Sequence, residues 1–278
     1  MRWRLSLALI LSGTAGVAEP LTFVRSVVLG SDLPEFGGLS AIEMPLSGSE
    51  ALMLSDRGAA FALSIDRAAG TYAITSVPQP RPHRDSEGLA WDGTAMFFSY
   101  EGPGAVVRAD GKRLAVHPDF STHRPNGSLE ALAAAPDGTL YTLPERSGDP
   151  NIPFPIYRYT GGTWEKWAAL PRLGPFLPAG ADIGPDGMLY ILERAFSPLG
   201  FRSRIRRLDP KAPEVETETV LKTRAGLHDN LEGLALWRSD SGATCLSMVS
   251  DNNFLSVQRT ELVEYALTET LAGGATCD

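Results

Sequence analysis

The hexapeptide Asp85-Ser86-Glu87-Gly88-Leu89-Ala90 decides the fold, because the chain contains further copies of it. Two close copies are Ser128-Leu129-Glu130-Ala131-Leu132-Ala133 and Asn230-Leu231-Glu232-Gly233-Leu234-Ala235. Two weaker copies, Gly37-Gly38-Leu39-Ser40 and Gly180-Ala181-Asp182-Ile183, carry Gly in place of Glu. Aligned on that column, the copies are 50, 43, 50 and 52 residues apart, and Ser40 falls level with Ala90. This spacing indicates five structural repeats of about fifty residues.

Each repeat has the pattern of several short antiparallel strands. Pro-Asp-Gly turns at 136–138 and 185–187 are each followed by a short apolar run, 139–143 and 188–192. Asp-Gly turns between such runs are strong hairpin signals. Three or four strands in each repeat are typical of a β-propeller blade. The sequence therefore predicts an all-β fold, a single β-propeller of five blades, with six blades or a β-sandwich as the alternatives.

The sequence predicts a signal peptide at the N-terminus, followed by a single domain. Arg2 and Arg4 precede a short apolar run, and Gly16-Val17-Ala18 supplies the small residues of a cleavage site, so residues 1–18 are expected to be a signal peptide. We expect a periplasmic or secreted protein in which residues 19–278 form one propeller domain. Pairing of residues 21–29 with 261–267 would close the ring and remove exposed strand edges.

Charge and cysteine content exclude several classes of partner. The chain has 25 basic and 33 acidic residues, net −8; removing residues 1–18 takes away two arginines and no acid, which leaves 23 and 33, net −10. This balance argues against nucleic acid or an anionic membrane as partner, and no other stretch reaches the ~20 apolar residues of a membrane span. In an oxidising compartment Cys245 and Cys277 are expected to form a disulfide, two free thiols being the alternative.

The repeated glutamate is the first candidate functional feature. The innermost strands of a propeller line its axis, so Glu87, Glu130 and Glu232 are expected to meet at one mouth of the channel. Carboxylates held that close raise one another's pKa unless a cation lies among them. Ca²⁺, which takes about six to eight oxygen ligands, is the predicted cation. The alternative is that each glutamate only binds backbone N–H groups of a neighbouring blade.

A second polar column follows the next apolar strand of each repeat. It adds acids to the three glutamates, so that the predicted metal ligands are Asp56, Glu87, Glu130, Glu145, Glu193, Glu232 and Asp251. The arginines beside these acids are predicted to bind an anionic substrate through their forked N–H groups, and they are Arg57, Arg146 and Arg194. Structural ion pairs with the neighbouring acids are the alternative.

Two histidines complete the candidate site. His83 and His228 lie four residues before Glu87 and Glu232. Either glutamate could act as a general base with its histidine nearby, so these four are the predicted catalytic residues; surface histidines are the alternative. The chain contains no Gly-x-Ser-x-Gly, P-loop, dinucleotide-binding or His-Glu-x-x-His motif, and no organic cofactor is predicted.

The motifs also resemble a known family. They are Gly37-Gly38-Leu39-Ser40, Leu54-Ser55-Asp56-Arg57-Gly58, Asp85 to Ala90, Leu143-Pro144-Glu145-Arg146, Leu192-Glu193-Arg194-Ala195-Phe196 and Asp229 to Ala235. Together they resemble the phytase-like proteins, described as "esterase-like activity of phytase", over about residues 30 to 268. The resemblance implies a propeller that hydrolyses phosphate or other esters, and propeller phytases depend on calcium. The motif positions that it carries over are Asp56, Arg57, Glu87, Glu145, Arg146, Glu193, Arg194 and Glu232.

The leading functional hypothesis is an exported, metal-dependent hydrolase that acts on phosphoesters or related esters at the channel mouth. Its expected partner is a small anionic substrate, and the chain is expected to be a monomer. A non-catalytic propeller that binds a ligand or a protein of the cell envelope is the first alternative. A hydrolase of the lactonase type is the second.

Overall fold

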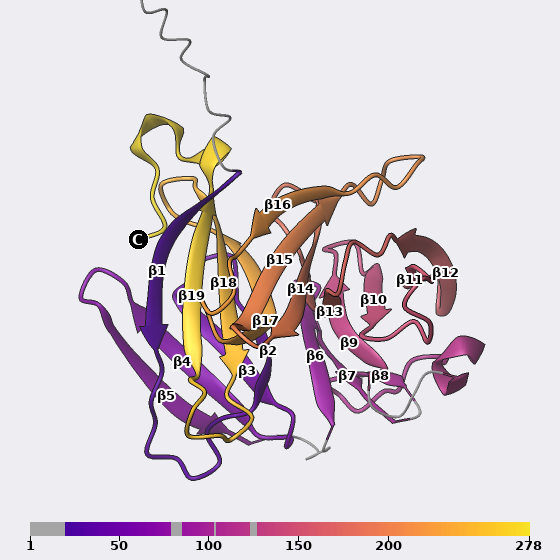
Figure 1. The fold of residues 1–278 in the computed structure, drawn as a ribbon, viewed down its shortest axis with the longest axis horizontal. Helices are drawn as coiled ribbons and strands as arrows, with labels where there is room; N and C mark the ends of the chain where they lie inside the picture. The colour runs from indigo at the N-terminus through magenta and orange to yellow at the C-terminus, as the bar shows by residue number, and fades with distance from the viewer. Residues whose placement is uncertain (1–19, 79–84, 103, 123–126) are drawn as a thin grey trace, which may run out of the picture.

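The computed structural model describes residues 20–78, 85–102, 104–122 and 127–278, and these form a five-bladed β-propeller (Figure 1). The predicted all-β fold and blade number are thereby confirmed. The predicted signal peptide and His83 lie outside the described residues. Within the described ranges, no helix is long and apolar enough to cross a membrane.

Four blades have four strands and one has three, each blade beginning with its innermost strand. Blades 1 and 2 contain β2 (Leu39–Glu43), β3 (Glu50–Ser55), β4 (Ala60–Asp66) and β5 (Thr71–Val77), then β6 (Ser86–Trp91), β7 (Met96–Tyr100) and β8 (Ala105–Arg108). Blades 3 and 4 contain β9 (Leu129–Ala134), β10 (Leu140–Pro144), β11 (Phe154–Thr160) and β12 (Thr163–Leu170), then β13 (Leu177–Ile183), β14 (Leu189–Ser197), β15 (Gly200–Leu208) and β16 (Glu218–Lys222). Blade 5 contains β17 (Asn230–Arg238), β18 (Thr244–Asp251), β19 (Glu261–Leu267) and β1 (Leu21–Val28).

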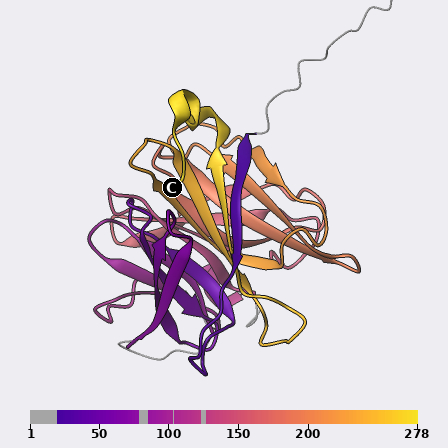
Figure 2. The ribbon, with the colours of Figure 1, turned by 90° about the vertical axis from the view of Figure 1, so that its left-hand side faces the viewer.

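Strand β1 closes the ring by joining the sheet of the last blade. It pairs antiparallel with β19, from Leu21 opposite Leu267 to Val28 opposite Glu261, and Figures 1 and 2 show the indigo strand β1 beside the yellow strand β19. The innermost strand of each blade contacts that of the next, and β17 contacts β2. The strand pairing expected at the two ends of the chain is therefore present.

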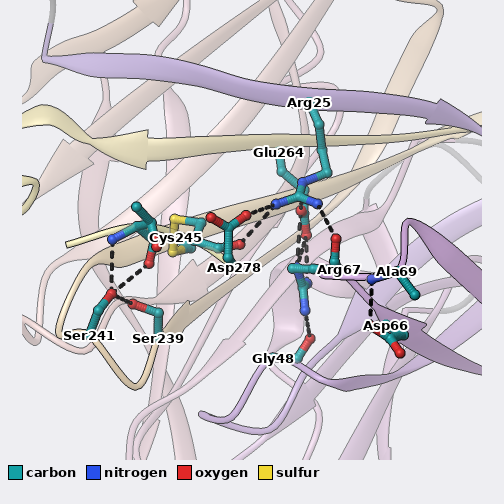
Figure 3. Close-up of polar contacts among 12 residues, drawn as sticks. Arg25, Gly48, Asp66, Arg67, Ala69, Ser239, Ser241, Cys245, Glu264 and Asp278 are labelled. Atoms are coloured by element: carbon teal, nitrogen blue, oxygen red, sulfur yellow. Dashed lines mark hydrogen bonds and ion pairs between the residues drawn. A yellow bond between two sulfur atoms is a disulfide. The ribbon is translucent and has the colours of Figure 1, made fainter. Parts of the chain in front are cut away.

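A buried ion-pair cluster fastens this closing blade to blade 1 (Figure 3). Glu264 of β19 is fully buried, and its carboxylate lies 3.1 Å from Nε of Arg25 in β1 and 2.6 Å from Nη2 of Arg67. Arg67 follows β4, and its guanidinium also lies 4.2 Å from the ring centroid of Trp237 in β17. One carboxylate thus holds together the first strand, the last strand and the neighbouring blade.

The C-terminal tail is fixed to the same blade by a disulfide. Cys245 in β18 is bonded to Cys277, and both residues are buried. Two short 3₁₀ helices, Thr268–Thr270 and Ala272–Gly274, carry the chain from β19 to this bond. A third 3₁₀ helix, Pro118–Thr122, precedes blade 3 and buries Phe120.

The hydrophobic core lies between the blades. Each of five buried clusters is formed by strands of two adjacent blades, for example Leu39 and Phe61 of blade 1 with Trp237 of blade 5. Inner strands are therefore buried on both faces, and β2, β9 and β17 are nearly continuous runs of buried residues. This explains why their sequences lack the strict alternation of a half-exposed strand.

Small residues let the inner strands approach one another closely around the axis. A Cβ atom on Gly180 would lie 2.4 Å from the backbone oxygen of Glu232, and one on Gly233 would lie 2.7 Å from the backbone nitrogen of Ile42. The axis itself is closed by inner-strand side chains, which leave a cavity of about 10 Å³. Such a volume holds at most about one water molecule. The two ends of the propeller axis are therefore separate surfaces.

Candidate functional site

A β-bulge in every inner strand places one residue at the same mouth of the axis. The bulged residues, found from the shifts in strand register, are Ser40, Glu87, Glu130, Ala179 and Glu232. The first four line the small axial cavity. The three glutamates are equivalent, as predicted, but the weaker copies were misaligned: Ser40 and Ala179, not Gly37 and Gly180, complete the column. Gly37 and Gly38 belong to the entering loop, where φ is positive.

The second strand of each blade adds one side chain beside each bulge. In each blade the residue before the bulge pairs with a residue of the second strand, and the next residue along the second strand lies beside the bulge. These next residues are Asp56, Glu101, Glu145, Arg194 and Asp251. Four of the five are acids, and the fifth is an arginine. We call the seven acids of the two columns the acidic rim; they are Asp56, Glu87, Glu101, Glu130, Glu145, Glu232 and Asp251.

Arg194 supplies the positive charge within the acidic rim. Its Nη2 lies 3.1 Å from Oε1 of Glu232 and 3.3 Å from Oε1 of Glu145, so it links blades 3, 4 and 5. Its own blade has Ala179 at the bulge, and Arg194 pairs with Leu177 beside that small residue. Burial lowers the pKa of Arg194, but Glu232, Glu145, Glu130 and Asp251 outweigh it, so the pKa is raised.

Burial and mutual repulsion raise the pKa values of Glu87, Glu130, Glu232 and Asp251 in the acidic rim. Burial, followed by the charges of Glu232, Glu101 and Asp56, raises the pKa of Glu87 to about 9. Burial raises the pKa of Glu232 to about 7, although Arg194 and the 2.7 Å hydrogen bond from Nδ2 of Asn230 both lower it. Burial likewise raises the pKa of Asp251 to about 6 and that of Glu130 well above its usual value. Near neutral pH the acidic rim thus contains both protonated and ionised carboxyl groups.

Unusual backbone geometry surrounds this mouth of the axis. Among the described residues, the non-glycine residues with positive φ are Asp85 at 68°, Asn253 at 48° and Phe254 at 53°. Asp85 lies two residues before Glu87, and the other two follow Asp251. Such conformations cost of order 1–3 kcal/mol each and are concentrated at functional sites. Their position is a second, independent indication that this end of the propeller is the working surface.

Arg57 lies at the edge of the acidic rim, and the ring of Phe254 covers one flat face of its guanidinium. Its guanidinium carbon lies 3.5 Å from the ring centroid of Phe254, and its side chain is exposed. Stacking uses the flat face of the guanidinium and leaves its N–H groups directed outward. Within the described part of the chain Arg57 forms no ion pair, whereas Arg146 lies 2.9 Å from Glu145. Among the described residues, the side-chain donors of Arg57 therefore bind no acid of the rim.

Glu193, a predicted metal ligand, lies apart from the acidic rim. It precedes Arg194 by one residue, and alternate strand residues point to opposite faces. Each of its carboxylate oxygens accepts hydrogen bonds from both Arg204 and Arg206, at 2.7–2.8 Å. The carboxylate is fully buried, so this group stabilises blade 4 from within.

His228, a predicted catalytic residue, faces the outer strands of blade 5. Its Nε2 lies 2.9 Å from the hydroxyl of Tyr265 in β19, and its ring stacks on Phe23 of β1. Burial, followed by the charge of Arg259, lowers the pKa of His228 to about 4. The structure therefore does not bring this imidazole together with the acidic rim.

Three contributors to the site were not assigned a role from the sequence. Glu101 stands in the second column and accepts a hydrogen bond from the backbone of Gly127, and register identifies it. Asn230 orients Glu232, and its position two residues earlier is the available signal. Phe254, which itself has a positive φ, stacks on the guanidinium of Arg57, and no sequence pattern indicates this contact.

A preformed calcium site is not part of this arrangement. Among the residues that the structure describes, no three His, Cys, Asp or Glu side chains form a group that could hold a metal ion. The charge that accompanies Glu232 and Glu145 is the guanidinium of Arg194. The side chains as placed therefore do not fit a ready set of calcium ligands.

Comparison with known proteins supports the fold and identifies the family. No curated protein matches the chain. Solved structures with similar folds include the α-L-arabinofuranosidase PaAbf62A of Podospora anserina in complex with cellotriose (9% identity, TM-score 0.53, 86% of this chain and 93% of that one). They also include the catalytic domain of the GH62 α-L-arabinofuranosidase of Coprinopsis cinerea (10% identity, TM-score 0.55, 88% of this chain and 95% of that one). At such identities the similarity shows the fold alone.

The family follows from a match of another kind. The model of the phytase-like family, described as "Esterase-like activity of phytase", matches residues 34–254. This range contains all five inner strands and every residue of the acidic rim. The chain therefore belongs to the phytase-like family.

Proposed function

We propose that this protein is an exported hydrolase of phosphoesters or related esters and that the acidic rim is its active site. The observation that carries the proposal is the pairing of Glu87 and Glu232, whose pKa values are raised to about 9 and about 7 on one surface. Two carboxyl groups separated in this way can divide the roles of acid and base at a single pH.

The two glutamates would transfer protons in opposite directions. Near neutral pH Glu87 is protonated and can give its proton to the leaving oxygen of an ester. Glu232 is partly ionised and can take a proton from the attacking water. The bond from the ester centre to the leaving oxygen breaks as the bond to the water oxygen forms. Glu87 ends ionised and Glu232 protonated, so exchange with solvent restores both.

Arginine placement supports an anionic substrate. Arg57 presents N–H donors at the edge of the rim while its face rests on Phe254. Arg194 is already bound to Glu145 and Glu232, so its charge acts mainly on those carboxylates. A phosphate or carboxylate group would bind to the fork of Arg57 with the scissile bond directed toward Glu87.

Export has separate support, and calcium is given no step in the proposed reaction. The disulfide between Cys245 and Cys277 supports export, because such bonds persist in oxidising compartments. Calcium has no assigned step, since the carboxylates as placed do not form a ligand set for it.

A substrate panel tests the proposal directly. Purified protein lacking residues 1–18 is incubated with a phosphomonoester, a phosphodiester, a carboxylester and a lactone, with and without Ca²⁺. We expect hydrolysis of at least one phosphoester or carboxylester. Turnover of the lactone alone would favour the lactonase alternative, and absence of product from all four would leave a non-catalytic binding protein.

A further inference from the structure

A large cavity of the described structure lies at the other end of the axis, away from the acidic rim. Its volume is about 1190 Å³, and it is lined by the last residues of the inner strands and by the turns that follow them. Because the axis between the two ends is closed to about 10 Å³, this second cavity is a separate site. Its volume exceeds the roughly 300–1,000 Å³ of ordinary small-molecule pockets.

Aromatic rings from two blades form one wall of the second cavity. Trp91 is the last residue of the inner strand β6, and 38% of its surface is exposed. Trp167 of β12 is held edge-to-face against Tyr141 at 5.4 Å, and the guanidinium of Arg158 lies 5.4 Å from the Trp167 ring centroid. Packed rings of this kind offer rigid flat surfaces at little entropic cost.

Two buried carboxyl groups line the same cavity. Glu43 and Asp182 lie three residues after the bulges of blades 1 and 4, the two blades that have no bulge glutamate. Oδ2 of Asp182 accepts a 2.6 Å hydrogen bond from the backbone of Leu236 in the next blade, and Oε1 of Glu43 accepts one of 3.2 Å from the backbone of Met44. Backbone donors therefore hold both carboxyl groups in place.

Both carboxyl groups are held partly neutral by their surroundings. Burial raises the pKa of Asp182 to about 7, and burial together with the charge of Asp182 raises the pKa of Glu43. A protonated carboxyl donates one hydrogen bond and accepts others. Such groups can bind hydroxyls without requiring a counter-charge.

The overall charge of the second cavity differs from that of the acidic rim. Four acidic residues are balanced by three basic ones, Arg158, Lys211 and Arg238. Two of the four acids are the partly neutral Glu43 and Asp182, so the lining has no strong excess of either sign near neutral pH. A balanced lining does not select for an ionic ligand.

Flat aromatic faces and hydroxyl-binding carboxyl groups, lining one large cavity of balanced charge, match the chemistry of a sugar chain. We propose that the second cavity binds a neutral saccharide, with the apolar face of a pyranose ring on Trp91 or Trp167 and hydroxyl groups directed to Glu43 and Asp182. This site is distinct from the proposed hydrolytic site, and its test does not depend on turnover.

Calorimetric titration tests the proposal. The whole protein without residues 1–18 is titrated with short soluble oligosaccharides built from glucose, xylose, galactose or N-acetylglucosamine, and with choline and inorganic phosphate as charged probes. We expect saturable binding of at least one oligosaccharide, no binding of choline, and no phosphate binding that survives Arg57→Ala, because phosphate is a candidate ligand of the proposed hydrolytic site. Trp91→Ala should weaken that binding by roughly thirtyfold, the scale of a tryptophan hot spot.

Two further variants keep the outcome decisive. Trp167→Ala removes a ring from a different blade, so it tests the wall if Trp91→Ala does not fold, as judged by its melting curve. Arg57→Ala, at the opposite end of the axis, should leave saccharide binding unchanged. The proposal is overturned if no oligosaccharide binds, if choline binds in its place or phosphate does so in Arg57→Ala protein, or if saccharide binding survives both tryptophan variants in folded protein.

Discussion

Nη2 of Arg194 lies 3.1 Å from Oε1 of Glu232, and this contact joins the second strand of blade 4 to the innermost strand of blade 5. The same guanidinium lies 3.3 Å from Oε1 of Glu145 in blade 3. A cation among the repeated carboxylates was expected from the sequence, and a side chain of the protein stands in that position. The charge balance of the acidic rim therefore depends on one residue.

Replacing Arg194 should make the acidic rim sensitive to calcium. Arg194→Met removes the charge that lowers the pKa of Glu232 and leaves Glu232 and Glu145 with only Asn230 and Arg146 as partners, which we expect to cost roughly 1–3 kcal/mol of stability. Ca²⁺ binding to the folded state raises stability by mass action. The melting temperature of the variant should therefore rise more with added Ca²⁺ than that of the wild type. An equal rise in both proteins would contradict the role given to Arg194.

Above pH 6.5, the usual pKa of the histidine side chain, the stability of the protein should fall as pH rises. An acid whose pKa is higher in the folded state binds more protons there than in the unfolded state, so its contribution to stability decreases with pH. For Glu87 this decrease extends from the usual value of 4.5 to about 9, and for Glu232 it ends at about 7. Glu87→Gln, which keeps the neutral form, should flatten the decrease above pH 7 in chemical denaturation. A wild-type curve that rises over this interval would refute the assignment.

The propeller and part of the candidate site could be predicted from the sequence. The parts that could not be predicted depend on strand register. Repeat spacing located Glu87, Glu130 and Glu232 in one column because their flanking residues are alike. It could not show that Ser40 completes that column, because loops of different length precede the inner strands and each bulge inserts one residue. The same one-residue ambiguity made Glu193 a predicted ligand, although Arg194 is the residue that faces the rim.

Other features depend on contacts that no repeat encodes. His228 occupies a matching sequence position to His83, yet its ring turns to Tyr265 on an outer strand. Several turns line the second cavity, and in the sequence these turns indicate only hairpins. Its aromatic wall combines Trp91 and Trp167, which come from different blades.

The pH dependence of turnover should report the two glutamates. If Glu232 must be ionised and Glu87 protonated, kcat/KM for the ester cleaved in the substrate panel rises through about pH 7 and falls through about pH 9. The two limbs belong to the interacting pair, since the groups influence each other's titration. A profile without either limb between these values would argue against the pair.

Substitution should separate the two roles. Glu232→Gln should remove the rising limb and Glu87→Gln the falling limb, each with a loss of about 10²–10⁴ in kcat. Glu218→Gln is the matched control, because Glu218 is an exposed acid paired with Arg207 on the outermost strand of blade 4. Its kcat should equal that of the wild type. Loss of activity in the control, or none in either rim variant, would contradict the mechanism.

Removing the disulfide should loosen the closing blade. Cys277→Ala opens a link between residues 32 apart in sequence, and the loss of its constraint on the unfolded chain corresponds to about 3–4 kcal/mol. The tail would then be held mainly by contacts such as the 2.6 Å ion pair between Arg25 and Asp278. The urea midpoint should fall, and a reducing agent should lower the wild-type midpoint by a similar amount without affecting the variant. A reducing agent that shifts both equally, or neither, would show that the bond does not stabilise the propeller.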